Sequence, residues 1–165
     1  MENLWAPWRM AFITPQTPRS DACIFCTQPD AYTDEEFRIL YRGERCFIML
    51  NLYPYNNGHL LIAPYKHAGS ISLLDAETLA ELMSQTQLAL SVLRLAMKPD
   101  GFNMGINEGK VAGAGFADHM HLHVVPRWNG DTNFMPVIAD IKVMPDHLDN
   151  VYLQLKAALM QIRGL

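Results

Sequence analysis

The hydrophobic and polar positions in the first half of the chain predict short strands. Residues 37–41 and 45–51 are rich in apolar residues and are predicted to form two strands, with Gly43 between them. A third apolar run, 60–63, follows an Asn-Asn-Gly sequence at 56–58 that is typical of a turn. Strands this short, joined by hairpin-length turns, indicate the start of an antiparallel sheet.

The spacing of apolar residues then changes to that of a helix. It begins at Asp75, a residue type that caps helices, and it ends at the breaking sequence Pro99-Asp100-Gly101. We interpret this stretch as one long amphipathic helix whose methionines fill the core. A second helix is predicted to start at Pro145 and to continue through Ile162.

The last predicted strand has histidine at every second position. Residues 102–107 are expected to form a strand, a loop with three glycines spans 108–118, and the sequence HMHLHVVPRW follows at 119–128. Alternation along a strand places the three histidines on one face and the apolar residues on the other. Strands, a helix and further strands predict an α+β fold: an antiparallel sheet of about five strands, one long helix and a C-terminal helix.

Composition and charge narrow the class of protein. Of the 165 residues, 50% are apolar and 18% are charged, as in soluble globular proteins. A net charge of −4 argues against nucleic acid as a partner, because surfaces that bind it are rich in Lys and Arg. The longest apolar run, 46–50, is too short to cross a membrane, and the N-terminus lacks a signal-peptide pattern. We therefore expect a cytoplasmic protein without a membrane partner.

We expect a single domain over residues 1–165 with three parts. The core spans 22–134, an N-terminal arm spans 1–21, and a C-terminal loop and helix span 135–165. Prolines interrupt the arm, whose large apolar side chains include Trp5 and Trp8. The arm is expected to dock either on the core of its own chain or on a partner subunit.

Three imidazoles on one strand face are hard to explain by packing alone. Each ring can act as a nucleophile, a hydrogen-bond donor or a metal ligand. A surface strand rich in histidine and a metal-dependent hydrolase with zinc on an HxH pair are the alternatives. The spacing Cys23-x-x-Cys26 indicates a metal site or a redox pair in a reducing compartment, whereas Cys46 lies in a strand-like run and is expected in the core.

Several motifs give the chain a specific resemblance. In the sequence HMHLHVV at 119–125, histidines alternate with hydrophobic residues. Three other motifs precede it: Asn51, the run GHLLIAP at 58–64 that closes at His67, and Asn-Glu-Gly at 107–109. In this order they resemble the histidine-triad (HIT) family over roughly residues 22–134. The sequences LWAPWRM near the start and PRWNGDTNF after the triad are similar to the branch that includes diadenosine polyphosphate-cleaving enzymes.

The resemblance implies nucleotidyl transfer through a covalent histidine. In the family the middle histidine attacks, which is His121 here, with the backbone carbonyl of His119 as the acceptor for its Nδ1–H. Attack needs a free lone pair on Nε2, so the proton must stay on the other nitrogen. His123 and His59 are the candidates to hydrogen-bond the non-bridging phosphate oxygens. His119 completes the catalytic set.

The substrate is less clearly defined. By the family pattern Asn51 is expected to contact ribose and Asn107 the phosphate or the leaving group, and the N–H groups of Gly113, Ala114 and Gly115 are expected to assist as an anion nest. Family hydrolases commonly have a polar Gln or Ser in this loop, which is absent here, and Asp118 or Lys110 would have to replace it. An adenine nucleotide is implied, but hydrolysis and phosphorolysis both stay open.

The resemblance also implies a metal and a partner. Cys23, Cys26, His67 and His119 match the four ligands of a structural zinc site, with a reduced thiol pair as the alternative. The family forms homodimers whose sheets join edge to edge, so we expect a sheet extended across a homodimer. A protein that binds nucleotides without catalysis would keep the same fold, and it is the remaining alternative.

Overall fold

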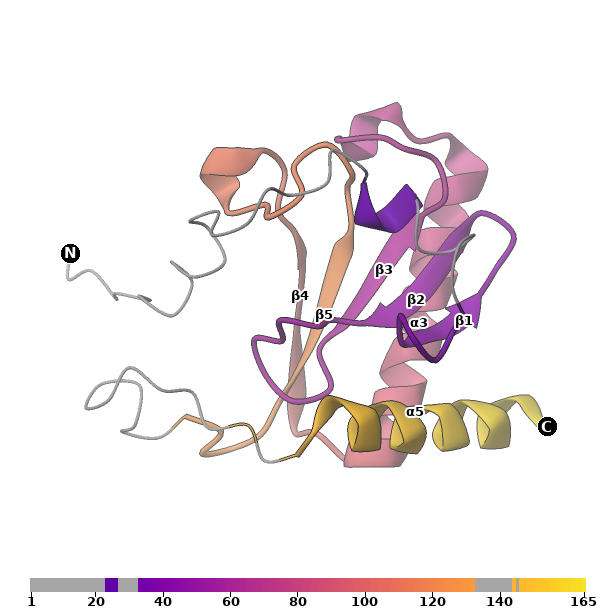
Figure 1. Ribbon diagram of the computed structural model, residues 1–165, viewed down its shortest axis with the longest axis vertical. Helices are drawn as coiled ribbons and strands as arrows, with labels where there is room; N and C mark the ends of the chain where they lie inside the picture. The colour runs from indigo at the N-terminus through magenta and orange to yellow at the C-terminus, as the bar shows by residue number, and fades with distance from the viewer. Residues whose placement is uncertain (1–22, 27–32, 133–143, 145) are drawn as a thin grey trace.

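The computed structural model describes residues 23–26, 33–132, 144 and 146–165. A five-stranded antiparallel sheet with the order β1-β2-β3-β5-β4 forms its centre (Figure 1). The strands are β1 (Ile39–Arg42), β2 (Cys46–Leu50), β3 (Leu60–Pro64), β4 (Gly101–Ile106) and β5 (Leu122–Arg127). The predicted α+β class and the five-stranded sheet are confirmed. The predicted N-terminal arm and Pro145 lie outside the described residues.

Two helices pack against one face of the sheet. Helix α3 (Ala76–Met97) contacts β2, β3 and β5, and helix α5 (Leu148–Arg163) packs against α3 and β1 (Figure 1). Leu82 and Leu93 of α3 and Leu155 of α5 are almost fully buried in this core. Burial of these apolar side chains provides most of the driving force for the arrangement.

The opposite face of the sheet is also covered. On β2, Ile48 and Leu50 belong to the core under the helices, while Phe47 and Met49 point the other way. They form a second cluster with Phe25 and with residues of β1 and β3. The Cys23–Cys26 turn therefore lies on the face without helices.

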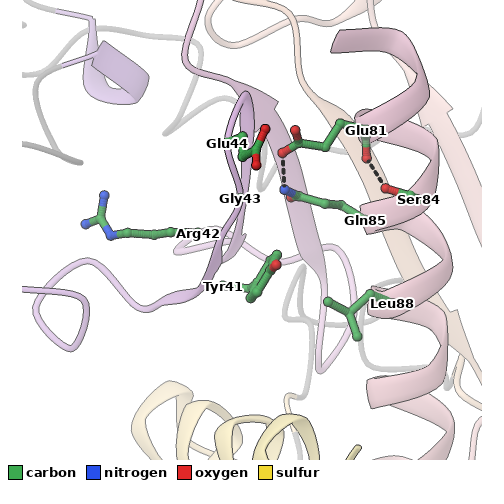
Figure 2. A pocket seen from close by; sticks show the side chains of 8 residues that line it. All are labelled: Tyr41, Arg42, Gly43, Glu44, Glu81, Ser84, Gln85 and Leu88. Atoms are coloured by element: carbon green, nitrogen blue, oxygen red, sulfur yellow. Dashed lines mark hydrogen bonds between the residues drawn. The ribbon is translucent and has the colours of Figure 1, made fainter. Parts of the chain in front are cut away.

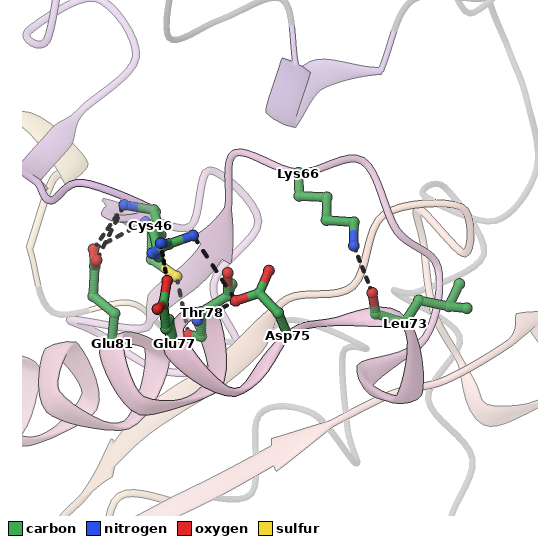
Figure 3. Close-up of polar contacts among 8 residues, drawn as sticks. Cys46, Lys66, Leu73, Asp75, Glu77, Thr78 and Glu81 are labelled. Atoms are coloured by element: carbon green, nitrogen blue, oxygen red, sulfur yellow. Dashed lines mark hydrogen bonds and ion pairs between the residues drawn. The ribbon is translucent and has the colours of Figure 1, made fainter.

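Polar contacts attach the start of α3 to β2 (Figure 3). Asp75 caps the helix as predicted, because its carboxylate accepts the N–H of Thr78 at 2.8 Å. One turn later, the Glu81 carboxylate accepts the backbone N–H groups of Arg45 at 3.1 Å and Cys46 at 3.0 Å. These two N–H groups have their partner on the helix, so Glu81 fixes the position of α3 along the sheet.

Replacing Glu81 by alanine is expected to lower the free energy of unfolding by about 1–3 kcal/mol, because the N–H of fully buried Cys46 loses its acceptor. Glu77→Ala is the matched control. That side chain is 72% exposed and pairs with the exposed Arg45 guanidinium, so its loss should cost under about 0.5 kcal/mol. Urea unfolding of both variants measures the difference, and equal losses would contradict the anchoring role of Glu81.

Two predicted boundaries are wrong. The strand predicted over 119–128 begins only at Leu122, because the N–H of Met120 donates to the Ala68 carbonyl at 2.7 Å instead of joining the ladder. The helix predicted from Pro145 begins at Leu148. Its entry is organised by Asp146, whose carboxylate accepts the N–H of His147 at 2.8 Å and keeps that residue extended. Among the described helices, none is long and apolar enough to cross a membrane.

Candidate active site and metal centre

The three histidines of the predicted triad lie together on the face of the sheet opposite the helices. Met120, Leu122 and Val124 point into the helix-side core, so the alternating residues point to the other face. The three imidazoles and His59 are each at most 8% exposed. The ring centroids of His121 and His123 are 4.8 Å apart, and those of His59 and His123 are 5.1 Å apart. Four histidines in contact form the candidate active site.

His121 is held in one tautomer. Its Nδ1 lies 2.9 Å from the backbone carbonyl oxygen of His119, and since a carbonyl only accepts, Nδ1 carries the proton. Burial lowers the pKa of His121, and the carbonyl contact opposes this shift. The ring is therefore neutral at pH 7, and its Nε2 has the lone pair that a nucleophile requires. The predicted acceptor of the Nδ1 proton is present.

A chain of hydrogen bonds fixes the protons on His59 and His123. The N–H of Tyr53 donates to Asn51 Oδ1 at 2.9 Å, so the amide nitrogen of Asn51 points to His59 Nδ1 at 3.2 Å. The N–H of Tyr55 also donates to His59 Nδ1, at 3.0 Å. With Nδ1 as an acceptor, His59 carries its proton on Nε2 and donates it to His123 Nδ1 at 2.9 Å. A neutral His123 therefore presents an Nε2–H.

A cluster of sulfur and nitrogen atoms lies beside the triad. The donor atoms of Cys23, Cys26, His67 and His119 all lie within 4.8 Å of one another. Cys26 Sγ is 3.2 Å from His67 Nδ1, and Cys23 Sγ is 3.3 Å from His119 Nδ1. His119 Nε2 donates to the Pro64 carbonyl at 2.8 Å, which leaves the lone pair of Nδ1 facing the thiols. Two thiols and two imidazoles at this spacing fit a tetrahedral metal ion such as zinc.

The pKa shifts of Cys26 and His119 bear on metal binding. Burial, together with the neighbouring Cys23 thiol, raises the pKa of Cys26 to about 11. Burial also lowers the pKa of His119, so this imidazole stays neutral and able to coordinate. A cation would be needed to stabilise the thiolate form of Cys26 at neutral pH.

Comparison with known proteins places this geometry in a family. A profile of the HIT domain matches residues 33–130. Over 156 aligned residues the chain is 42% identical to AP-4-A phosphorylase of Mycobacterium tuberculosis. The alignment covers 90% of this chain and 79% of that protein. The chain belongs to the HIT domain family.

Two further HIT proteins resemble the chain. A Zn-bound histidine triad family protein from Mycobacterium smegmatis aligns with a TM-score of 0.69 at 31% identity, covering 87% of this chain and 96% of that one. Bis(5'-adenosyl)-triphosphatase of Dictyostelium discoideum is 32% identical over 89 residues, which is 54% of this chain and 59% of that protein.

The other residues expected in the HIT site lie as follows. Both ring nitrogens of His119 are engaged, by the thiols and by Pro64, and its backbone carbonyl accepts the Nδ1 proton of His121. The N–H groups of Gly113 and Ala114 donate to carbonyls at the start of their own turn, at 3.0 and 3.4 Å. A phosphate in the predicted nest would compete with these two bonds. Asn107 follows β4 and is half-buried, and its side chain makes no hydrogen bond to the described residues.

Two aromatic neighbours of the histidines were not predicted from the sequence. Tyr55 stacks on His123 with ring centroids 5.6 Å apart and planes at 17°, and Phe25 stacks on His121. Both lie in turns, where apolar periodicity does not report packing.

A shallow cleft of about 450 Å³ lies away from this site (Figure 2). It is bounded by the turn between β1 and β2 and by α3, and its lining includes Gly43, Glu81 and Gln85 but no histidine. The buried, tautomer-fixed rings of the histidine cluster have chemistry that the cleft lacks, so the cluster is the candidate active site.

Proposed function

We propose that this HIT protein cleaves the α-phosphate linkage of a diadenosine polyphosphate or a related adenylate through a covalent nucleotidyl-histidine on His121. The hydrogen bond from His121 Nδ1 to the His119 carbonyl is the observation that carries the proposal, because it keeps the proton on Nδ1 and leaves a lone pair on Nε2. The names of two relatives, AP-4-A phosphorylase and bis(5'-adenosyl)-triphosphatase, support the substrate class.

The reaction has two displacements at the same phosphorus. His121 Nε2 attacks the α-phosphorus in line, a P–N bond forms, and the bond to the bridging oxygen breaks so that the remaining phosphates leave with their electron pair. The His119 carbonyl stabilises the positive charge that the ring acquires. A second nucleophile then attacks phosphorus, and the electrons of the P–N bond return to His121.

His123 and His59 support the transferred group. With its proton on Nε2, His123 can donate to a non-bridging oxygen, and His59 orients it through their 2.9 Å contact. Asn51 and Tyr55 hold the proton of His59 on Nε2. Asn51 is also proposed to contact ribose, and Asn107 and residues 113–115 to contact the phosphates.

We propose that Cys23, Cys26, His67 and His119 hold a structural zinc ion. When bound, zinc would cross-link these four side chains and would leave no position for substrate, so the displacements would rely on the other histidines. Its ligands join the Cys23–Cys26 turn to the segment that precedes β5. Reduced thiols agree with the proposed cytoplasmic location.

The test is incubation with diadenosine tetraphosphate in the presence and absence of inorganic phosphate. Rapid quenching at alkaline pH should trap an adenylate on His121 that acid releases, as expected for a phosphoramidate. Phosphate as the acceptor would yield ADP from the adenylate, and water would yield AMP. Turnover without any acid-labile adduct in single-turnover experiments would contradict the proposal.

We also infer a homodimer that joins two sheets through β4. The sheet has β1 and β4 at its edges, but α5 covers β1, where Tyr152 Oη and Lys156 Nζ donate to the Ile39 and Leu40 carbonyls. On β4, Met104 is 55% exposed. Among the described residues β4 pairs with β5 alone, and an edge strand of this kind favours pairing with a second copy.

Met104→Lys is therefore expected to convert the dimer to a monomer at micromolar concentration, because it places two like charges at the paired edges. Met83→Lys is the control, since that methionine is 57% exposed on α3 rather than on the sheet edge. Sedimentation velocity measures both variants. A monomeric parent, or a dimeric Met104→Lys variant, would contradict this interface.

A further inference from the structure

Phe25 lies between the two cysteines of the metal turn and touches the proposed nucleophile. Its side chain is 1% exposed. Its ring lies against His121 with centroids 4.8 Å apart and planes at 30°, and its centroid is 5.1 Å from that of His119. The function proposed above assigns no role to this residue.

The ring plane of His121 depends on such packing. One hydrogen bond, from Nδ1 to the His119 carbonyl, fixes a single atom of the imidazole. Phe25 covers a face of the ring, and His123 meets it edge-on at 4.8 Å and 63°. The lone pair of Nε2 lies in the ring plane, so the direction of attack follows from the orientation of that plane.

Phe25 is in turn held by the metal cluster and by the hydrophobic cluster on the sheet face without helices. The N–H of Cys26 donates to the Cys23 carbonyl at 3.1 Å, which closes a tight turn around Phe25. The thiols on either side contact His119 and His67 at 3.2–3.4 Å. Phe116 also meets the Phe25 ring edge-on at 5.8 Å. A metal ion held by these four side chains would tie the turn, and with it the phenyl ring, to the segment that carries His121.

We propose that Phe25 is a positioning residue that orients the imidazole of His121 for in-line attack, and that the metal centre influences the reaction through this contact. The inference rests on the proposed function, because it takes His121 as the nucleophile. Loss of the flat phenyl face lets the imidazole tilt while the nucleotide still binds. The effect therefore falls on the rate of phosphorus transfer and not on KM.

Kinetics of Phe25→Leu test the proposal on the zinc-loaded protein with diadenosine tetraphosphate. Single-turnover formation of the histidine adduct and kcat should both fall about 10- to 100-fold, with KM changed by less than about threefold. Phe47→Leu is the matched control. Phe47 is equally buried in the same cluster but stacks on Tyr65 at 5.3 Å, so the same substitution should leave the rate within about threefold of the parent.

Phe25→Tyr retains the aromatic face and is expected to keep the rate within about threefold of the parent. This variant also tests the proposal if Phe25→Leu does not fold. Equal rate losses in Phe25→Leu and Phe47→Leu would overturn the proposal. So would a rise in KM at unchanged kcat, which would mean that Phe25 contacts the substrate, or a Tyr variant as slow as a folded Leu variant.

Nuclear magnetic resonance of the His121 ring gives a readout independent of activity. In the parent protein the stacked phenyl ring should shift the imidazole C–H resonances upfield, and nitrogen shifts should report the Nδ1–H tautomer alone. Phe25→Leu, or removal of zinc from the parent by a chelator, should abolish the upfield shift. Unshifted ring protons in the zinc-loaded parent would overturn the proposal. A parent that shows the shift but forms no adduct would instead contradict the proposed function.

Discussion

Replacing His121 by alanine is expected to lower kcat by about 10⁴-fold or more, because the variant lacks the atom that bonds to phosphorus. The residual rate reflects binding and the donors that remain, as in other enzymes that lose a covalent nucleophile. The imidazole is 6% exposed, donates to the His119 carbonyl and packs on Phe25, so the variant is also checked for folding. Steady-state turnover of diadenosine tetraphosphate measures the effect, and the trapped adduct should disappear in parallel.

His147→Ala is the control for this experiment. That histidine is exposed before helix α5, where its side chain does not cap the helix, so its loss should leave kcat within about twofold of the parent. A His121→Ala variant as active as the parent would remove the covalent mechanism and favour a nucleotide-binding role. Folding of both variants is checked by circular dichroism and by their zinc content.

The orientation of the triad was predictable because it follows from period-two alternation. The sequence HMHLHVV places hydrophobic residues at every second position, and Met120, Leu122 and Val124 indeed pack into the helix-side core. Burial of one face therefore determined the orientation of the histidines without any knowledge of long-range contacts. The start of α3 was predictable for a similar reason, since its cap depends on a local bond from Thr78 to Asp75.

The features that could not be predicted depend on contacts between distant segments. The late start of β5 results from the bond between Met120 and Ala68, residues that only the folded sheet brings together. The contact of Asn51 with His59 depends on the path of the chain between them, and the backbone N–H of Tyr53 orients the Asn51 amide. Apolar spacing contains no information on either contact, because one joins two backbone groups and the other joins two polar side chains.

Phe25 illustrates the same limit at the metal centre. The Cys-x-x-Cys spacing indicated a metal site or a redox pair at the two thiols, and the resemblance to HIT proteins implied the two histidine ligands. Neither observation indicated that the intervening phenylalanine packs on the triad, because a residue inside a tight turn has no periodic neighbours from which its direction could be inferred. Only the packing of the turn on the sheet links the metal cluster to the nucleophile.

Replacing Cys26 by serine is expected to lower the midpoint of thermal unfolding by about 10 °C in the presence of zinc. The ion binds the folded chain through four residues that the unfolded chain does not hold together. At a free zinc concentration about 1,000 times Kd, binding stabilises the fold by about 4 kcal/mol, and 1 kcal/mol corresponds to about 2–4 °C in a chain of this size. Differential scanning calorimetry measures the midpoint, and metal analysis should show one zinc ion per chain in the parent and little in the variant.

A chelator separates loss of the metal from loss of the side chain itself. It should lower the unfolding midpoint of the parent to nearly that of Cys26→Ser, whose own midpoint should hardly change, because a site with three ligands retains zinc poorly. Serine keeps the shape of the cysteine side chain with a smaller atom at the γ position, and the turn is partly exposed, so the metal-free proteins should differ by less than about 1 kcal/mol. The chelator could instead leave the unfolding midpoint of the parent unchanged while Cys26→Ser still unfolds at a lower temperature than the parent. That result would mean that the cysteines act as a reduced thiol pair without a metal. In that case the turn would be held against the triad only by Phe25 and its apolar neighbours.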